Sequence, residues 1–395
     1  MSDFKFVHCA DLHLGSRFSG VRSKDSRLAE RMTESTFESF SNIIDLVRSE
    51  DADFLVISGD VFDSDSITPG TRFRYTQLLE KAEVPCFIAR GNHDSRTSWE
   101  DSIPLPPNAY EFGGDPESLI HELRNGGRVE ISGISFTSSN THEDLASKLE
   151  GSKGIFTVGC VHCDVDSTEG LGYAPCELRD LVSKNIDYWA LGHIHKREVL
   201  HERPYVVYPG NPQGRNIKES CEKGAFLVTV TEDTVTDLRF VPTNTILWNR
   251  MEADITGKTF GTFIEHVASM MDENLIVRLT VNGRGPLDRM LRTEPDEVIK
   301  AVQNRSGGII ESLELNTRPE ELPMLEGNDL LSGIAKAASE LENADREHLI
   351  DVMCSTGTSR NHLQAYFEEL DDDELKAMVR DAGSRLLERF TEAAE

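Results

Sequence analysis

The stretch "HCADLHLGS" (residues 8–16) comes directly after the short apolar run "FKFV" and places an aspartate and a histidine two residues apart. Residues i and i+2 of an extended segment point to the same side of the backbone. Asp11 and His13 can therefore present two ligand-type side chains to one cleft. Taken alone, such a pair is usually only a polar turn, so its meaning depends on whether matching side chains follow later strands.

Matching side chains do follow four later apolar runs. The predicted strands are 4–9, 53–58, 85–89, 155–161 and 188–191, and helical patterns at 28–49 and 72–82 separate the first three. Strands that alternate with helices predict a layered α/β sheet with parallel pairing. The side chains that follow the later strands are Asp60, then Asn92, His93 and Asp94, then His162, and finally His193 and His195. Because ligands gather at the carboxyl ends of strands in open α/β sheets, we expect these side chains to share one site.

The residue types in this set are those of a metal centre. A mixture of aspartate, asparagine and imidazole suits manganese, iron or zinc better than calcium, and an aspartate can bridge two cations. The sequence therefore predicts two divalent cations, with Mn²⁺ as the first choice and Mg²⁺, Fe²⁺ and Zn²⁺ as alternatives. Gly59, Gly91 and Gly192 directly precede ligand positions, where they would let the backbone turn tightly.

The cysteines do not indicate a second metal site. Their number, seven, is odd and they are widely spread, which is typical of reduced thiols in a reducing compartment. The pair "CVHC" (160–163) has the spacing of a zinc site, but no second C-x-x-C follows it. We interpret Cys160 and Cys163 as strand residues that pack on either side of His162.

Beyond residue 200 the pattern changes. Close-set strands at 205–211, 224–231 and 234–243 predict an antiparallel sheet packed on the first one. We predict a first domain over 1–243, a compact βαβαβ unit over 244–318 and an acidic helical region over 319–395. A chain of 395 residues is long enough for two or three domains.

Composition limits the classes of partner. The formal net charge of −28 argues against a broad basic surface, since DNA binding needs local positive charge. Basic residues beside the motif loops are the candidate DNA contacts, namely Arg17, Arg96, Arg197 and Arg215, although arginines of this kind also form ordinary surface ion pairs. No run approaches 18 apolar residues and no secretory signal is visible, so we expect a cytoplasmic protein without a membrane segment.

The series "DLH", "GDVFD", "GNHD", "VH" and "GHIH" along residues 11–195 resembles the calcineurin-like metallophosphoesterases, and within them the SbcD-type exonucleases of DNA double-strand-break repair. The segment 208–230 is most similar to the YhaO-like exonucleases. The resemblance implies a four-layer metallophosphoesterase β-sandwich flanked by helices, a small α+β capping domain that binds DNA, and C-terminal helices. It also implies two cation sites, one formed by Asp11, His13, Asp60 and His195, and the other by Asp60, Asn92, His162 and His193.

The same resemblance implies the reaction. It assigns His93 to the transition state or to protonation of the leaving oxygen, with Asp94 fixing its orientation. It implies a DNA exonuclease, with endonuclease activity left open, that hydrolyses phosphodiester bonds with a hydroxide activated by two metals. A phosphatase or cyclic-nucleotide phosphodiesterase on the same scaffold is the alternative, although protein phosphatases of this superfamily typically carry an arginine after the second motif, where this chain reads "GDVFDSD". A non-enzymatic scaffold is disfavoured because every ligand is present.

The resemblance finally implies protein partners. Members of the family commonly dimerise, and helices after the capping domain bind an SbcC-like, SMC-type coiled-coil ATPase. The stretches 329–341 and 375–390 both carry apolar residues at near-helical spacing. Such a stripe can lie in the groove of a partner, or it can cover the protein's own core, and the sequence leaves both open.

Overall fold

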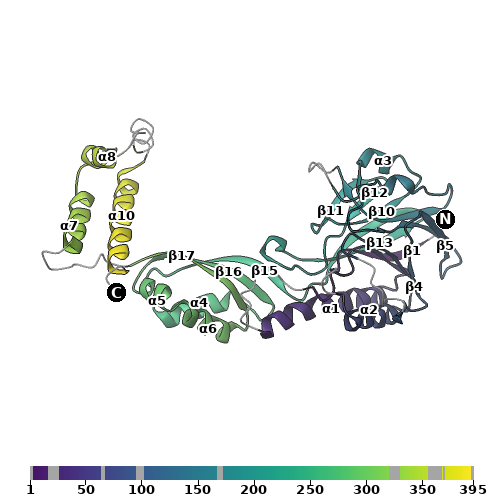
Figure 1. Ribbon diagram of the computed structural model, residues 1–395, viewed down its shortest axis with the longest axis horizontal. Helices are drawn as coiled ribbons and strands as arrows, with labels where there is room; N and C mark the ends of the chain where they lie inside the picture. Colours follow the sequence, from purple (N-terminus) through teal and green to yellow (C-terminus); the bar gives the residue numbers. More distant parts are fainter. Residues whose placement is uncertain are drawn as a thin grey trace. The chain divides into compact units, whose positions relative to one another are not determined.

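Two β-sheets that share one core make up most of the first 242 residues (Figure 1). The computed structural model describes residues 3–16, 26–63, 67–94, 102–166, 172–319, 330–354, 367 and 370–392. The first sheet has the order β14-β13-β1-β2-β3-β4, with β1 (Phe4–Cys9), β2 (Phe54–Ser58), β3 (Cys86–Ala89), β4 (Ala109–Glu111), β13 (Gly224–Thr231) and β14 (Thr234–Pro242). In this sheet β1 to β4 run parallel, while β13 pairs antiparallel with both β1 and β14.

The second sheet has the order β11-β12-β10-β7-β6-β5. Its strands are β5 (Glu117–Glu122), β6 (Arg128–Ile134), β7 (Phe156–His162), β10 (Tyr188–Gly192), β11 (Glu198–Glu202) and β12 (Tyr205–Tyr208). The four central strands run parallel, and β5 and β11 pair antiparallel at the two edges. A short parallel pair, β8 (Asp164–Val165) with β9 (Pro175–Cys176), lies apart from both sheets.

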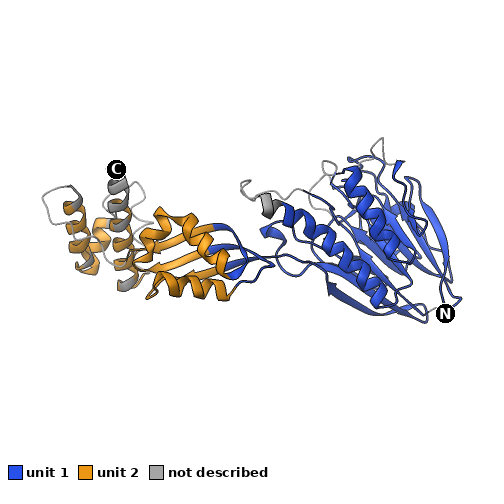
Figure 2. Ribbon diagram, turned by 90° about the horizontal axis from the view of Figure 1, so that it is seen from below, with its two compact units in different colours: residues 1–251, 271–279, 306–312 blue, residues 252–270, 280–305, 313–395 orange. Residues whose placement is uncertain are grey.

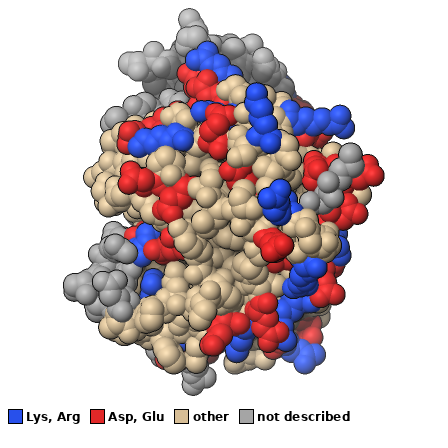
Figure 3. Space-filling model, turned by 90° about the vertical axis from the view of Figure 1, so that its right-hand side faces the viewer, with Lys and Arg blue, Asp and Glu red and all other residues tan. Residues whose placement is uncertain are grey.

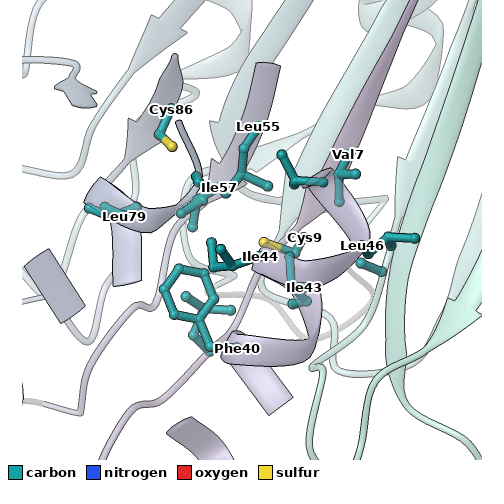
Figure 4. Packing of buried hydrophobic residues seen from close by; sticks show 14 of the residues in the cluster. Val7, Cys9, Phe40, Ile43, Ile44, Leu46, Leu55, Ile57, Leu79 and Cys86 are labelled. Atoms are coloured by element: carbon teal, nitrogen blue, oxygen red, sulfur yellow. The ribbon is translucent and has the colours of Figure 1, made fainter. Parts of the chain in front are cut away.

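The alternation of side chains along each strand builds the layers. In β1, Phe6 points between the two sheets, where its ring stacks on Phe54 at 4.9 Å and meets Tyr188 edge-on at 5.1 Å. Val7 and Cys9 point to the opposite face, as the two-residue period of a strand requires. Helices α1 (Ser26–Ser49) and α2 (Pro69–Lys81) cover that face with a core built from apolar side chains of both helices and of β1 to β3 (Figure 4).

The outer face of the second sheet is covered as well. The one-turn helix η2 (Ala146–Lys148) and α3 (Leu178–Val182) pack there, and the indole of Trp189 donates to the carbonyl of Leu181 at 3.1 Å. Helices, sheet, sheet and helices therefore form four layers. The predicted four-layer α/β sandwich is confirmed.

Two details of the sheet prediction were wrong. The five ligand-bearing strands do not form one sheet, because β1, β2 and β3 lie in the first sheet and β7 and β10 lie in the second. The strands predicted at 205–243 do not form a separate antiparallel sheet either. β12 joins the second sheet parallel to β10, and β13 with β14 extends the first sheet.

After β14 the chain forms a three-stranded sheet of order β15-β16-β17, with β15 (Leu247–Asp254), β16 (Leu275–Arg284) and β17 (Ile309–Arg318). The helices α4 (Phe260–Ser269), α5 (Leu287–Thr293) and α6 (Pro295–Ser306) connect these strands. The chain as a whole forms two compact units, one of residues 1–251, 271–279 and 306–312, and the other of residues 252–270, 280–305 and 313–395 (Figure 2). The predicted domain limits at 243 and 318 stay predictions.

The C-terminal helices in the described part are α7 (Leu330–Glu342), α8 (Arg346–Cys354) and α10 (Asp372–Glu392). Leu349, Phe367, Leu375 and Val379 form a small buried cluster among them. A Cβ added at Gly383 would lie 2.6 Å from the Cβ of Ala338, so α7 and α10 approach closely at this glycine. Among the described residues, no helix combines the length and the apolar character that crossing a lipid bilayer requires.

Candidate metal centre

The seven predicted ligand side chains come together where strands of both sheets end. Asp11 and His13 follow β1, Asp60 follows β2, and Asn92 follows β3 in the first sheet, while His162 ends β7 and His193 follows β10 in the second. Two backbone hydrogen bonds hold the first two loops side by side, from Asp11 N to Gly59 O at 2.9 Å and from His13 N to Asp60 O at 3.0 Å. The expectation that carboxyl ends of parallel strands meet at one place holds across two sheets.

Backbone strain is concentrated at these residues. Asp11, His13, Asp60 and His193 have φ values of 55°, 44°, 50° and 108°, although none of them is a glycine. Positive φ costs free energy in a residue with a Cβ, and such strain gathers at functional sites. The loops are held in this shape by the hydrogen bonds between them rather than by local preference.

Two glycines make room for the ligands. Gly59 has φ +91°, and a Cβ there would lie 2.5 Å from His162 Nδ1. At Gly91 a Cβ would lie 2.1 Å from Asp60 Oδ1. The expected turn conformation is therefore found at Gly59, whereas Gly91 is needed because another ligand passes close to its backbone.

One half of the centre consists of two facing imidazoles. His13 Nδ1 lies 2.7 Å from Asp63 Oδ1, and His195 Nδ1 lies 2.9 Å from Glu219 Oε1. Because a carboxylate only accepts hydrogen bonds, these contacts assign the ring proton to Nδ1 in both histidines. The two Nε2 atoms then carry lone pairs, and they lie only 3.1 Å apart. Two facing acceptors at this distance suit a cation that binds both, and Asp11 lies within reach of both rings.

The other half repeats this arrangement around His162. Its Nδ1 lies 3.0 Å from the carbonyl oxygen of Ser58, which assigns the proton to that nitrogen. Its Nε2 lies 3.0 Å from Asn92 Oδ1 and 3.4 Å from Asp60 Oδ2. The ring of His193 packs against His162 with the centroids 5.3 Å apart. Once His162 Nε2 has lost its proton, three acceptor atoms lie close together here, so the residues fit a bound divalent cation.

Two carboxylates lie between the halves. Asp60 Oδ2 is 3.9 Å from His13 Nε2, in addition to its contact with His162. Asp11 groups with His13 and His195 and also with Asp60 and His162. The resemblance implied Asp60 as the bridging residue, and the geometry gives Asp11 a comparable position.

The electrostatics of the buried cluster differ from one histidine to another. Burial lowers the pKa of His13 and, together with the charge on His162, that of His193. Burial alone would raise the pKa of Asp60, but positive charge on His162 and His13 lowers it well below its usual range. Burial would likewise lower the pKa of His162, yet the carboxylates of Asp60 and Asp11 raise it to about 9. His162 therefore carries a proton when no cation balances these carboxylates, and it must lose that proton to bind one.

His93 lies at the edge of the cluster and differs from the ligands. Its side chain is 49% exposed and its Nδ1 lies 3.3 Å from Asp63 Oδ1. Its backbone N–H donates to Asp60 Oδ1 at 2.9 Å, and its ring meets that of His13 edge-on. An exposed imidazole beside the cluster can reach a substrate while contributing no ligand atom to the cluster itself.

The resemblance assigns Asp94 to the orientation of His93, and the contacts of its carboxylate are with the backbone of the ligand loops. Its carboxylate accepts backbone N–H groups of Val61, Phe62 and Gly91 at 3.2, 2.9 and 2.9 Å. Burial and the neighbouring Asp60 nevertheless raise the pKa of Asp94 to about 7. Asp94 therefore joins the two ligand loops "GDVFD" and "GNHD", and the carboxylate beside the His93 ring is Asp63.

Sequence reasoning missed two residues, Asp63 and Glu219. Asp63 is the last residue of "GDVFD", three positions after the ligand Asp60, and this spacing was its available signal. Glu219 lies in the one-turn helix η3 (Ile217–Glu219) and also accepts from Asn211 Nδ2 and from Arg215 N, each at 2.8 Å. No sequence pattern marks it. Carboxylates that hold the second nitrogen of a ligand histidine fix both its tautomer and its orientation.

The four candidate DNA contacts have different surroundings. Arg215 Nη1 lies 3.0 Å from Asp63 Oδ2, so Arg215 is tied to the centre itself. The guanidinium of Arg197 lies 3.8 Å above the ring of Phe240. Arg17 and Arg96 lie outside the described residues. On the face shown in Figure 3, the coloured basic and acidic side chains are interspersed rather than separated.

Comparison with known proteins agrees with this geometry. The family model described as calcineurin-like phosphoesterase matches residues 4–197. The uncharacterized metallophosphoesterase YhaO of Bacillus subtilis is 31% identical over 372 residues, which are 89% of this chain and 90% of YhaO. The DNA double-strand break repair protein Mre11 of Methanopyrus kandleri is 24% identical over 379 residues, covering 88% of this chain and 79% of the relative. Mre11 of Sulfolobus acidocaldarius is 22% identical over 305 residues, 72% of this chain and 76% of the relative. The chain belongs to the calcineurin-like metallophosphoesterase family, and it is a metal-dependent phosphoester hydrolase.

Proposed function

We propose that this protein is a DNA exonuclease that uses two divalent cations, Mn²⁺ in the first instance, and that it acts in DNA repair. The observation that carries the proposal is the cluster of facing acceptor atoms with the half-exposed His93 at its edge. The relatives named as DNA double-strand break repair proteins favour DNA over other phosphodiesters, although their identity to this chain is low.

In this proposal each cation has its own ligand set. Asp11, His13, Asp60 and His195 hold one, and Asp60, Asn92, His162 and His193 hold the other. When bound, such a pair of cations lowers the pKa of a water molecule and neutralises charge on the phosphate. Asp63 and Glu219 hold His13 and His195 through their Nδ1 atoms, so both rings keep their Nε2 atoms directed at the cluster.

His93 supplies the proton that leaves with the product. With its Nδ1 in contact with Asp63, a protonated His93 would pass a proton to the oxygen of the departing nucleotide. An alkoxide is a poor leaving group when nothing protonates it. We therefore expect this proton transfer to increase the rate of hydrolysis strongly. Asp94 acts indirectly, because it holds the loop that carries His93 against the loop that carries Asp60.

We also propose a protein partner for the C-terminal region, an SMC-type coiled-coil ATPase of the SbcC kind, and a homodimer of the nuclease. Part of each predicted apolar stripe packs inside the helices, as Ala338, Leu375 and Val379 are buried. Met378 and Leu386 on α10 remain 37% and 47% exposed and are available to a partner.

Substrate preference tests the proposal against its alternative. The full chain would be assayed with Mn²⁺ on end-labelled single- and double-stranded DNA, on p-nitrophenyl phosphate and on 2′,3′- and 3′,5′-cyclic AMP. We expect kcat/KM for DNA to exceed that for each small substrate by about 100-fold or more, the scale on which a built site discriminates. A higher kcat/KM for the monoester or for a cyclic nucleotide would contradict the nuclease and favour the phosphatase or the cyclic-nucleotide phosphodiesterase.

A further inference from the structure

A pocket of about 520 Å³ opens beside the metal centre, within the first compact unit. Asn92, whose Oδ1 lies 3.0 Å from His162 Nε2, forms part of its wall. Phe136, which also lines the pocket, meets the His162 ring edge-on with the centroids 5.7 Å apart. A chemical group bound in this pocket would therefore lie close to a phosphate bound at the cation site.

Hydrogen bonds join the segments that form the walls of the pocket. These segments follow β3, β4 and β6. Arg90 N donates to Ser135 Oγ at 2.9 Å, and this hydroxyl donates to the carbonyl of Phe112 at 2.6 Å. Phe136 N donates to the carbonyl of Arg90 at 3.2 Å, and Ser135 N to that of Gly113 at 2.8 Å. A pocket with such walls loses little conformational entropy on binding.

The charges in the pocket do not suit a second phosphate. Its guanidinium, Arg90, is paired with Glu111, with Nε 2.7 Å from Oε1. Asp94 lines the same pocket, so the described lining holds two acidic residues and one basic residue. Exposed hydroxyl residues, Thr137, Ser138 and Ser139, lie on the rim and can both donate and accept hydrogen bonds. This chemistry suits a neutral group with several donors and acceptors.

We propose that this pocket binds the nucleoside, base and sugar, that is attached to the phosphate being cleaved. The inference rests on the proposed function and deepens it, because it names the part of the substrate that the chain recognises beside the cations. The volume lies within the range of about 300–1,000 Å³ that small-molecule sites occupy. If the phosphate binds at the cations, Asn92 would lie between the bound phosphate and the bound nucleoside.

The test compares esters that share a leaving group. Methyl p-nitrophenyl phosphate carries no nucleoside. The p-nitrophenyl esters of thymidine 5′-phosphate and thymidine 3′-phosphate carry a thymidine attached to the phosphate through its 5′ or its 3′ oxygen. Ser139→Trp would fill the pocket from its exposed rim, and Ser138→Trp serves as a second variant if the first does not fold. Ser183→Trp, at an exposed position outside the pocket, is the matched control. All proteins would be assayed with Mn²⁺.

We expect kcat/KM of the native chain to be at least about tenfold higher for one or both thymidine esters than for the methyl ester. The pocket variant should remove most of this preference and leave the methyl ester within about twofold of the native value, and the control should change neither. Equal rates on all three esters in the native chain, or an unchanged preference in a folded pocket variant, would overturn the inference while leaving a phosphodiesterase intact. If none of the three esters is hydrolysed, the proposed function fails, and the inference fails with it.

Discussion

His93 differs from the ligand side chains around it in both exposure and contacts. Its ring is half exposed and touches Asp63, whereas the rings of His13 and His162 are buried and have an Nε2 atom within 3.4 Å of another acceptor. A residue placed in this way can act on the substrate without holding a cation. The roles of His93 and of the ligands can therefore be separated by experiment.

We predict that His93→Ala keeps both cations and lowers kcat on DNA by about 10²–10⁴-fold, the usual effect of losing a general acid. Metal content measured by mass spectrometry, together with single-turnover rates, checks the two halves of this statement. His348→Ala, at an exposed position on α8, is the matched control and should change neither quantity. Loss of a cation from the His93 variant would make His93 a ligand and would refute its assigned role.

His8 gives the fold a dependence on pH that is separate from catalysis. It is fully buried between the sheets, with Nδ1 3.0 Å from Tyr188 Oη and Nε2 3.3 Å from Ser58 Oγ. Burial lowers its pKa from 6.5 to about 3, so the folded protein holds it neutral. The unfolded chain binds the proton more readily than the folded one. The free energy of unfolding therefore keeps its full value above pH 6.5 and decreases as the pH falls from 6.5 toward 3.

Between pH 7 and pH 5 the loss from His8 should be about 2 kcal/mol in the free energy of unfolding. Urea unfolding with a chelator present, at both pH values, would measure it in the native chain and in His8→Gln, whose amide does not titrate. We expect the native chain to lose about 2 kcal/mol more than the variant over this interval. An equal loss in both proteins would show that His8 is not held neutral by the fold.

Among the elements, the loop after β2 and the loop after β3 hold each other in place. Asp94 joins the loop after β3 to the loop after β2, and Gly91 lets the two pass closely, since a Cβ at this position would lie 2.1 Å from Asp60 Oδ1. A methyl group at this position cannot be accommodated without moving a ligand. The position of Asp60 therefore depends on the neighbouring strand as well as on its own.

Gly91→Ala should weaken Mn²⁺ binding by about tenfold or more, comparable to the effect of losing a residue that orients a ligand. Gly261→Ala is the matched control, because a Cβ there meets nothing within 4 Å and the position lies in helix α4. Calorimetric titration of both variants with Mn²⁺ is the measurement. Equal affinity in the two variants would mean that the loops adjust freely and that the close approach has no role.

Much of the site was predictable from sequence because each ligand follows an apolar run. The predicted strand at 188–191 is β10 (Tyr188–Gly192), and His193 follows it directly. The distribution of these strands over two sheets was not predictable, because β5 (Glu117–Glu122), at the edge of the second sheet, alternates half-buried and exposed residues and gives no apolar signal. Asp63 and Glu219 were missed because a carboxylate that orients a ligand histidine needs only spatial proximity, which no spacing in the chain encodes.

At the scale of the whole molecule, the C-terminal helices are the part whose role the hydrolytic centre does not explain. Their buried residues pack on one another, and exposed apolar side chains remain on α10. We predict that deleting residues 328–395 leaves a metal-loaded phosphodiesterase that no longer binds the ATPase partner. Co-purification of the full and truncated chains with a candidate SMC-type coiled-coil ATPase, together with activity on DNA, is the measurement.

A surface variant keeps this test independent of folding. Met378→Glu combined with Leu386→Glu changes two exposed positions and leaves the buried cluster intact. It should weaken partner binding while the chain stays monodisperse and active. Undiminished binding by the truncated chain, or its collapse into aggregates, would show that these helices serve their own protein's core.

We expect the facing acceptor atoms to form two cation sites joined by Asp60. Anomalous diffraction from Mn²⁺-soaked crystals of the native chain and of the Asp60→Ala variant would locate both sites. We predict two peaks about 3.5–4 Å apart, the separation of two-metal hydrolases. One peak should lie within coordination distance of His13 and His195, the other of Asn92 and His162, and both should weaken in the variant. A single peak, or two peaks at full occupancy in the absence of the Asp60 carboxylate, would rule out a two-cation centre joined by Asp60.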